Sequence, residues 1–150
     1  MVPLEALRKS EIFEGLTDDE LAAIGKIARE EIYEAGACIC VENEVATKLY
    51  IVREGRVAIL INIGRGRQTV VDTVTKGGSF SWSAMVPPYI LTGTVKAVEN
   101  TKVIAINGRD LQELCRKNCR ACYTIMEKLA TIVSARLEDT RLQLISLMYG

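Results

Sequence analysis

Three closely spaced cysteines are the residues whose types and spacing most directly suggest chemistry. They are Cys115, Cys119 and Cys122, in the pattern C-x3-C-x2-C. Cysteine thiolates are ligands for zinc and for iron–sulfur clusters. A tetrahedral site needs a fourth ligand, however, and Cys38 and Cys40 belong to a distant predicted strand. Because cysteine is also among the most frequently buried residue types, we expect the cluster to hold no metal. A cysteine-based redox or metal sensor is the alternative interpretation.

The absence of histidine restricts the catalytic chemistry that is open to this sequence. Without histidine the chain can form neither a Ser-His-Asp nor a Cys-His catalytic arrangement. It can hold no histidine-ligated metal, which also excludes the metal-binding cupins. No other nucleophile or acid–base constellation is apparent. We therefore expect a protein that is not an enzyme and that has no catalytic residues, no metal site and no cofactor.

The composition is typical of one packed domain, with 150 residues of which 49% are hydrophobic and 25% charged. The formal net charge of zero argues against broad, nonspecific nucleic-acid binding, which needs a basic surface. The sequence has no apolar run of the ~18 residues that a transmembrane helix requires, and no signal peptide opens it. We expect free thiols, a location in the reducing cytoplasm and no membrane contact.

Helical periodicity at both ends of the sequence encloses a central segment of strand periodicity. A short helix is predicted over residues 4–10, and Thr17 with Glu20 forms a capping box that starts a second helix. A helix is expected over residues 109–117, and a long one from about residue 120 to about residue 147. Short strands separated by glycine and asparagine turns indicate a β-barrel or sandwich; they are expected at residues 38–42, 49–52, 56–63, 68–74, 92–98 and 102–106.

Two motifs and the order of elements resemble the cyclic-nucleotide-binding domain family. Residues 12–16 (IFEGL) and 19–21 (DEL) are similar to the family's opening helices, and residues 49–57 (LYIVREGRV) are similar to its central hairpin. The resemblance implies a mainly β fold with flanking helices, in which a double-stranded β-helix (a jelly-roll β-roll) carries a long C-terminal helix. We expect one domain over residues 1–150, made of N-terminal helices (1–31), the β-roll (32–106) and C-terminal helices for dimerisation (107–150).

The phosphate-binding cassette of the family resembles residues 80–95 without a gap, but two of its functional side chains are replaced. Trp82 stands where the family has the glutamate that binds the ribose, and Leu91 stands where it has the arginine that binds the phosphate. Thr92 matches the family's hydroxyl, Ser81 replaces a glycine and Gly93 replaces an alanine. The resemblance places the ligand pocket at Phe80, Ser81, Trp82, Ser83, Ala84, Leu91, Thr92, Gly93 and Thr94.

Loss of the arginine would weaken a phosphate ligand by roughly ten- to a hundredfold, so tight binding of cyclic AMP is not expected. Three interpretations of this degenerate phosphate-binding cassette remain. The pocket has collapsed and the domain is a structural or protein-interaction scaffold; the pocket senses another small molecule of unknown identity; or it still binds a cyclic nucleotide weakly.

The long C-terminal helix has an apolar pattern that alternates by three and four residues, as coiled-coil positions do. A second stripe, Ile125, Leu129 and Ile132, is expected to pack on the chain's own β-roll. A helix of about 28 residues is about 42 Å long, too long to lie only along its own domain, and we predict a parallel homodimer, as the resemblance implies. Its seam is predicted at Cys119, Tyr123, Met126, Ala130, Val133, Leu137, Thr140, Leu144 and Leu147.

Taken together, these features predict a dimeric, non-enzymatic signalling protein of the cytoplasm, a ligand-sensing or regulatory module. Its expected partners are a second copy of the chain, a small-molecule ligand and a possible protein partner. In the family a helix-turn-helix domain often follows the long helix; the sequence holds none, so direct DNA binding is not expected.

Overall fold

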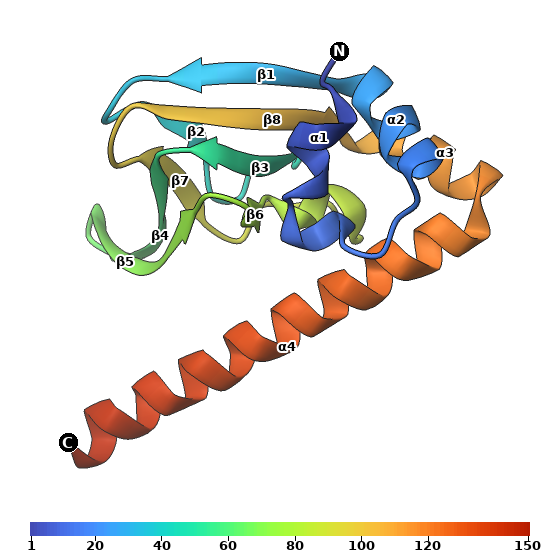
Figure 1. The fold of residues 1–150 in the computed structure, drawn as a ribbon. Coiled ribbons are helices and arrows are strands. Elements are labelled where there is room, and N and C mark those ends of the chain that lie inside the picture. The colour runs from blue at the N-terminus through green and yellow to red at the C-terminus, as the bar shows by residue number, and fades with distance from the viewer.

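The computed structural model describes all 150 residues and contains two four-stranded antiparallel sheets, flanked by helices from both ends of the chain (Figure 1). One sheet has the strand order β1-β8-β3-β6 and the other β2-β7-β4-β5. The strands are β1 (Ala28–Tyr33), β2 (Cys38–Cys40), β3 (Lys48–Glu54), β4 (Arg56–Gly64), β5 (Arg67–Thr75), β6 (Ser79–Phe80), β7 (Thr94–Ala97) and β8 (Thr101–Asn107). This architecture, with its long C-terminal helix, confirms the predicted fold class.

Three of the four α-helices, all except the first, begin at a polar residue whose side chain caps the helix. The helices are α1 (Leu4–Arg8), α2 (Asp18–Ile27), α3 (Gly108–Lys117) and α4 (Cys119–Tyr149), together with the short 3-10 helices η1 (Glu11–Phe13) and η2 (Trp82–Met85). The capping box of Thr17 and Glu20 is present at the start of α2, as predicted. Asn107 caps α3 by accepting from the backbone N–H groups of Arg109 and Asp110. No helix is long and apolar enough to cross a bilayer.

Alternation along β3 and β8 divides the hydrophobic core in two, because successive side chains of a strand point to opposite faces. Tyr50 and Val52 of β3 join the core between the two sheets, with Val103 of β8. Leu49 and Ile51 point the other way, into a core that the helices cover. Both faces of these two central strands are therefore buried, which explains their nearly continuous apolar sequence.

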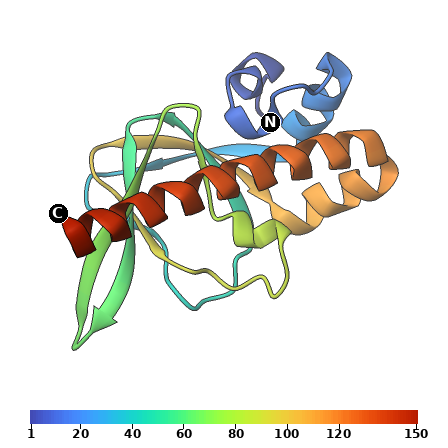
Figure 2. The same cartoon turned by 90° about the horizontal axis from the view of Figure 1, so that it is seen from below.

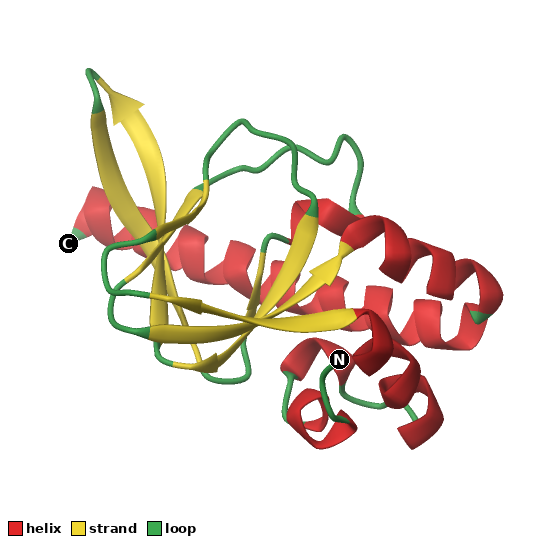
Figure 3. Cartoon of the chain, turned by 90° about the horizontal axis from the view of Figure 1, so that it is seen from above, coloured by secondary structure: helices red, strands yellow, loops and turns green.

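The long helix α4 starts beside α3, crosses the N-terminal helices and continues past the β-roll toward the β4–β5 hairpin (Figures 1 and 2). Its three buried residues are Ile125, Leu129 and Ile132, the stripe that was expected to face the chain's own fold. They lie in the helix-covered core, together with Phe13 of η1. The β4–β5 hairpin projects from the roll near the end of α4 (Figure 3).

The first strand differs from the sequence-based expectation. β1 begins at Ala28, so that the expected division at residue 32 falls inside it. Its sequence, AREEIY, has the charged residues of a helix, but its backbone pairs with β8 from Ala28 opposite Ile106 to Tyr33 opposite Thr101. The strand is at the edge of its sheet and mostly exposed, which is where charged side chains are tolerated in a β-ladder. The two-residue strand β6 was not anticipated either.

Candidate functional site

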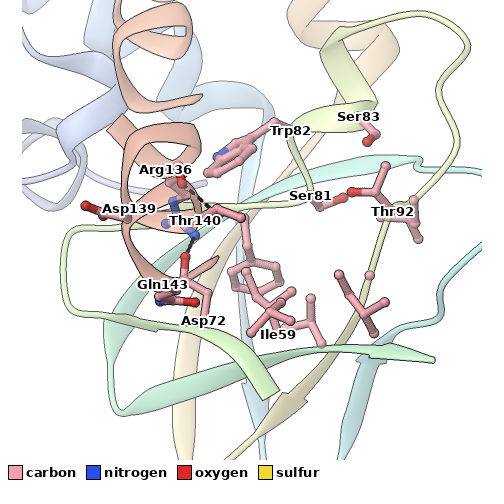
Figure 4. A pocket seen from close by; sticks show the side chains of 16 residues that line it. Ile59, Asp72, Ser81, Trp82, Ser83, Thr92, Arg136, Asp139, Thr140 and Gln143 are labelled. Carbon is pink, nitrogen blue, oxygen red and sulfur yellow. Dashed lines mark hydrogen bonds and ion pairs between the residues drawn. The ribbon is translucent and has the colours of Figure 1, made fainter. Parts of the chain in front are cut away.

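A cavity of about 390 Å³ lies at the cassette, between the turns that flank η2 and β7, the β4–β5 hairpin and α4 (Figure 4). Most of the residues that the sequence assigned to a pocket line it: Phe80, Ser81, Trp82, Ser83, Leu91, Thr92 and Gly93. This volume is within the range of small-molecule sites, so neither Trp82 nor Leu91 fills the space.

The other two predicted pocket residues lie behind the cavity wall. Ala84 is buried, and its carbonyl oxygen accepts a hydrogen bond from Gln112 of α3 (3.0 Å). Thr94 is also buried, and its hydroxyl accepts from the backbone N–H of Glu42 (3.0 Å). These two residues therefore fix the cassette to α3 and to the segment after β2, and they do not face a ligand.

The backbone of the cassette explains two of its unusual residues. Ser81, where the family has glycine, adopts the left-handed conformation with φ 65° and ψ 41°, which turns the chain from β6 into η2. Gly93 lies directly against β4: a Cβ atom there would be 2.9 Å from Cγ2 of Ile59 and 3.3 Å from the carbonyl oxygen of Leu60. Alanine, which the resemblance gives at this position, would require the Ile59 side chain to shift.

Trp82 and Leu91, which replace the family's polar ligands, occupy different parts of the wall. The Trp82 side chain is half-buried, its indole N–H donates to the Ser79 hydroxyl (2.9 Å), and its ring points toward α4 (Figure 4). Leu91 is 7% exposed and belongs to the core between the sheets. Thr92 is exposed at the mouth. The cassette thus offers an indole, an aliphatic wall and hydroxyl groups.

The fourth wall comes from α4 and was missed by the sequence analysis. Arg136, Asp139, Thr140 and Gln143 face the cavity. They follow the buried stripe of α4 at the same helical spacing, so that extending the series beyond Ile132 would have found them. The stripe changes from apolar to polar where the helix leaves the core and reaches the cavity.

Arg136 ties this wall to the roll. Its guanidinium forms an ion pair with Asp72 of β5, and its Cζ atom lies 4.6 Å from the centroid of the Trp82 ring (Figure 4). Asp72 also accepts from the backbone N–H of Thr73 (2.8 Å). Asp139 is the third charged residue at the cavity. The single cation of the lining is thus neutralised, and one negative charge remains in excess.

The residues of the predicted seam lie outside the cavity, with one exception. Thr140 lines the cavity, and Met126 is half-buried against the helix-covered core. The others are exposed: Cys119, Tyr123, Ala130, Val133, Leu137, Leu144 and Leu147. The exposed fractions of Leu137 (51%) and Leu144 (56%) are high for leucine on a helix. The apolar stripe therefore has no partner within its own chain, and the homodimer stays a prediction.

The cysteines do not come together as a metal-binding group. Cys115 is buried, Cys122 is half-buried and Cys119 is exposed, and the structure contains no cluster of three acidic or thiol side chains with the arrangement of a metal site. Burial, followed by interaction with Cys122, raises the pKa of the Cys115 thiol to about 12. Burial likewise raises the pKa of Cys40 to about 12. Both thiols are therefore protonated at neutral pH and are poor nucleophiles.

Comparison with known proteins places the chain among relatives. The family model described as "Cyclic nucleotide-binding domain" matches residues 30–118. A solved structure of a proposed cyclic nucleotide-binding protein from Geobacter metallireducens is 31% identical, with a TM-score of 0.81 over 91% of this chain and 99% of its own. The catabolite activator protein of Thermus thermophilus is 22% identical, with a TM-score of 0.77 over 93% of this chain and 63% of its own.

Curated relatives are longer than this chain. Glutaminase 1 of Bradyrhizobium diazoefficiens is 27% identical over 133 residues, which are 87% of this chain and 21% of that protein. The chain spans 21%, 29% and 62% of the three curated relatives that it matches. The similarity is therefore to one part of each of them.

Proposed function

The chain belongs to the cyclic nucleotide-binding domain family, and we propose that it is a non-enzymatic, ligand-sensing regulatory module that does not bind cyclic nucleotides tightly. The observation that carries this proposal is the open cavity of about 390 Å³ at a cassette with Trp82 and Leu91 in its wall. A collapsed pocket would leave no space for a ligand, so the cavity favours a sensor over a scaffold.

Electrostatics argue against a cyclic nucleotide as the ligand. A cyclic phosphate carries a negative charge, and hydrogen bonds to a charged group contribute ~1.5–3 kcal/mol each. Leu91 offers none of these bonds. The one cation at the cavity, Arg136, is paired with Asp72, and Asp139 adds a further negative charge. An anionic ligand would therefore contact an apolar wall, in a cavity whose two carboxylates outnumber its single cation.

The regulatory proposal also fits the relatives. The match to glutaminase 1 covers 21% of that protein, so the resembling segment is a small part of it. We infer that the present chain contributes regulation and not catalysis, since it has no histidine and burial raises the pKa of the Cys40 and Cys115 thiols. Its output would pass through α4, which forms one wall of the cavity and also carries the exposed apolar stripe.

A titration with cyclic AMP and cyclic GMP tests the proposed ligand selectivity. A ligand present at a hundred times its dissociation constant stabilises a protein by ~2.7 kcal/mol, which raises the Tm of a domain of this size by several degrees. We expect differential scanning calorimetry to show no such rise in Tm at micromolar concentrations of either cyclic nucleotide. A rise of several degrees with either nucleotide would refute the proposal.

A further inference from the structure

The cavity already holds a cation, which the chain itself supplies. The guanidinium of Arg136 lies on the ring of Trp82 and pairs with the carboxylate of Asp72. An aromatic face attracts an organic cation through the quadrupole of the ring, and a carboxylate matches a guanidinium in charge and geometry. Trp82 and Asp72 thus form a cation site that Arg136 occupies in this structure.

The remaining charge at the cavity would favour a cation over an anion. Asp72 and Asp139 are the two carboxylates of the lining, Arg136 is its only basic residue, and no lysine is present. If Arg136 moved away, the carboxylate of Asp72 would face an incoming ligand without its counter-charge, and Asp139 would add negative charge at the rim. Solvent screens the charge of Asp72, whose side chain is 39% exposed, so the face of the Trp82 ring would supply a second part of the attraction.

Arg136 is on a part of α4 that can move without uncovering the core. Ile132 is the last buried residue of the helix, and after it every residue except the half-buried Arg136 is exposed. The ion pair with Asp72 is the only one between this part of α4 and the roll. Displacement of one side chain would therefore free the end of the helix from the β4–β5 hairpin.

We propose that the ligand of the cavity is a small organic cation, a guanidinium or ammonium group on an apolar body, which replaces Arg136 on Trp82 and Asp72. The proposal rests on the proposed function and names its ligand class. The apolar body would lie against the aliphatic wall that includes Ile59 and Leu91. Binding would release the end of α4, so that Arg136 acts as an internal competitor that keeps the unliganded protein closed.

The test uses n-butylguanidinium and its uncharged isostere n-butylurea as probes. Trp82 is the one tryptophan of the chain, so the change in its fluorescence reports binding at the site directly. Removal of the competitor by Arg136→Ala should tighten the binding of n-butylguanidinium at least about tenfold relative to the wild type. The affinity for n-butylurea should be at least about tenfold lower than that for n-butylguanidinium in this variant.

Two further variants test whether Asp72 is responsible for the preference for the charged probe. In the Arg136→Ala background, Asp72→Asn should weaken the preference for n-butylguanidinium over n-butylurea, because the amide keeps the shape of the carboxylate without its charge, while the Trp82 ring still attracts a cation. The matched control is Asp19→Asn, an exposed position of α2 that does not line the cavity. It should leave the preference unchanged.

The outcomes separate this proposal from the proposed function. If Arg136→Ala binds both probes equally, or binds neither, the organic-cation proposal is overturned, whereas the cavity can still take another ligand. If cyclic AMP quenches Trp82 at micromolar concentration in the wild type, the proposed function fails whatever the cation probes do. Tighter binding of n-butylguanidinium to Arg136→Ala, weakened by Asp72→Asn and unchanged by Asp19→Asn, supports the proposal.

Discussion

At the scale of single residues, two substitutions decide what the cassette can bind. Trp82 and Leu91, which the resemblance places at the positions of the family's glutamate and arginine, both line the cavity. The surrounding backbone keeps the turn of the cassette, with Ser81 in the left-handed region before η2. The site is therefore altered in chemistry more than in shape.

Restoring the two family residues should restore affinity for cyclic AMP. The double variant Trp82→Glu, Leu91→Arg supplies a carboxylate for the ribose and a guanidinium for the phosphate. Because a hydrogen bond to a charged group contributes ~1.5–3 kcal/mol, we expect cyclic AMP to bind at least about tenfold more tightly than to the wild type, measured by isothermal titration calorimetry. Trp82→Glu alone removes the indole but adds no cation, and it should show no gain. A folded double variant that still ignores cyclic AMP would show that the cassette backbone no longer holds a nucleotide.

At the scale of elements, the sequence predicted those parts of the fold that depend on local signals. The capping box at Thr17, the cap at Asn107 and the helix break at Asn118 are all local side-chain to backbone bonds, and all are present. β1 was not recognised, because only its pairing with β8 overrides the helical character of its residues.

The same distinction applies to the site. The cassette could be located from its own sequence, because its residues are close together along the chain. Arg136 is 64 positions from Asp72 along the sequence and 54 positions from Trp82, although it contacts both. Such contacts depend on where α4 crosses the roll, which no local pattern specifies.

Glu20 connects the N-terminal and C-terminal helices and gives a pH-dependent prediction at this scale. Its carboxylate accepts from the backbone N–H of Thr17 (2.9 Å), from the amide of Asn118 (2.9 Å) and from Arg120. These hydrogen bonds lower the pKa of Glu20. The bond from the Thr17 backbone has the largest effect, followed by those from Arg120 and Asn118. A carboxyl whose pKa is lower in the folded state stabilises the protein above its unfolded-state pKa of ~4.3 and loses that contribution as the pH falls through its folded-state pKa.

We therefore expect Glu20→Gln to lower the free energy of unfolding by ~1–2 kcal/mol at pH 7, because one amide oxygen cannot accept all these bonds. The difference from the wild type should shrink below about pH 4, as the wild-type carboxyl becomes protonated. Urea unfolding followed by circular dichroism at several pH values measures both effects. Glu34→Gln, at an exposed turn position, is the control and should change little. A constant difference across the pH range would mean that the ionised carboxylate is not what stabilises the helices.

At the scale of the whole molecule, α4 is the element that brings the parts together. In its first half, one face of α4 is buried at Ile125, Leu129 and Ile132. Farther along the helix, the same face lines the cavity at Arg136. A neighbouring face carries the exposed apolar stripe that includes Val133, which has no partner in its own chain. A ligand that changed the position of Arg136 would therefore also change the orientation of this stripe.

We predict that the exposed stripe joins two copies of the chain in a parallel homodimer, centred near Leu137. Leu137→Asp would place two carboxylates together in an apolar interface. An unpaired buried charge destabilises such an interface by ~3–5 kcal/mol. The variant should therefore be monomeric at concentrations where the wild type is a dimer, as measured by light scattering over a dilution series. Arg136 is next to Leu137 and does not belong to the predicted seam. It is nevertheless unsuitable as a control, because it contacts Asp72 and Trp82.

Leu142→Asp is the appropriate control for this experiment. Leu142 is 59% exposed, receives the same substitution and lies about 140° around the helix from Leu137, at 3.6 residues per turn. It should leave the dimer intact if the seam has been assigned to the correct face. If the wild type is a monomer at high micromolar concentration, or if Leu137→Asp dimerises as well as the wild type, the assignment is wrong. Dissociation by Leu142→Asp and not by Leu137→Asp would place the interface on a different side of α4 from the predicted seam.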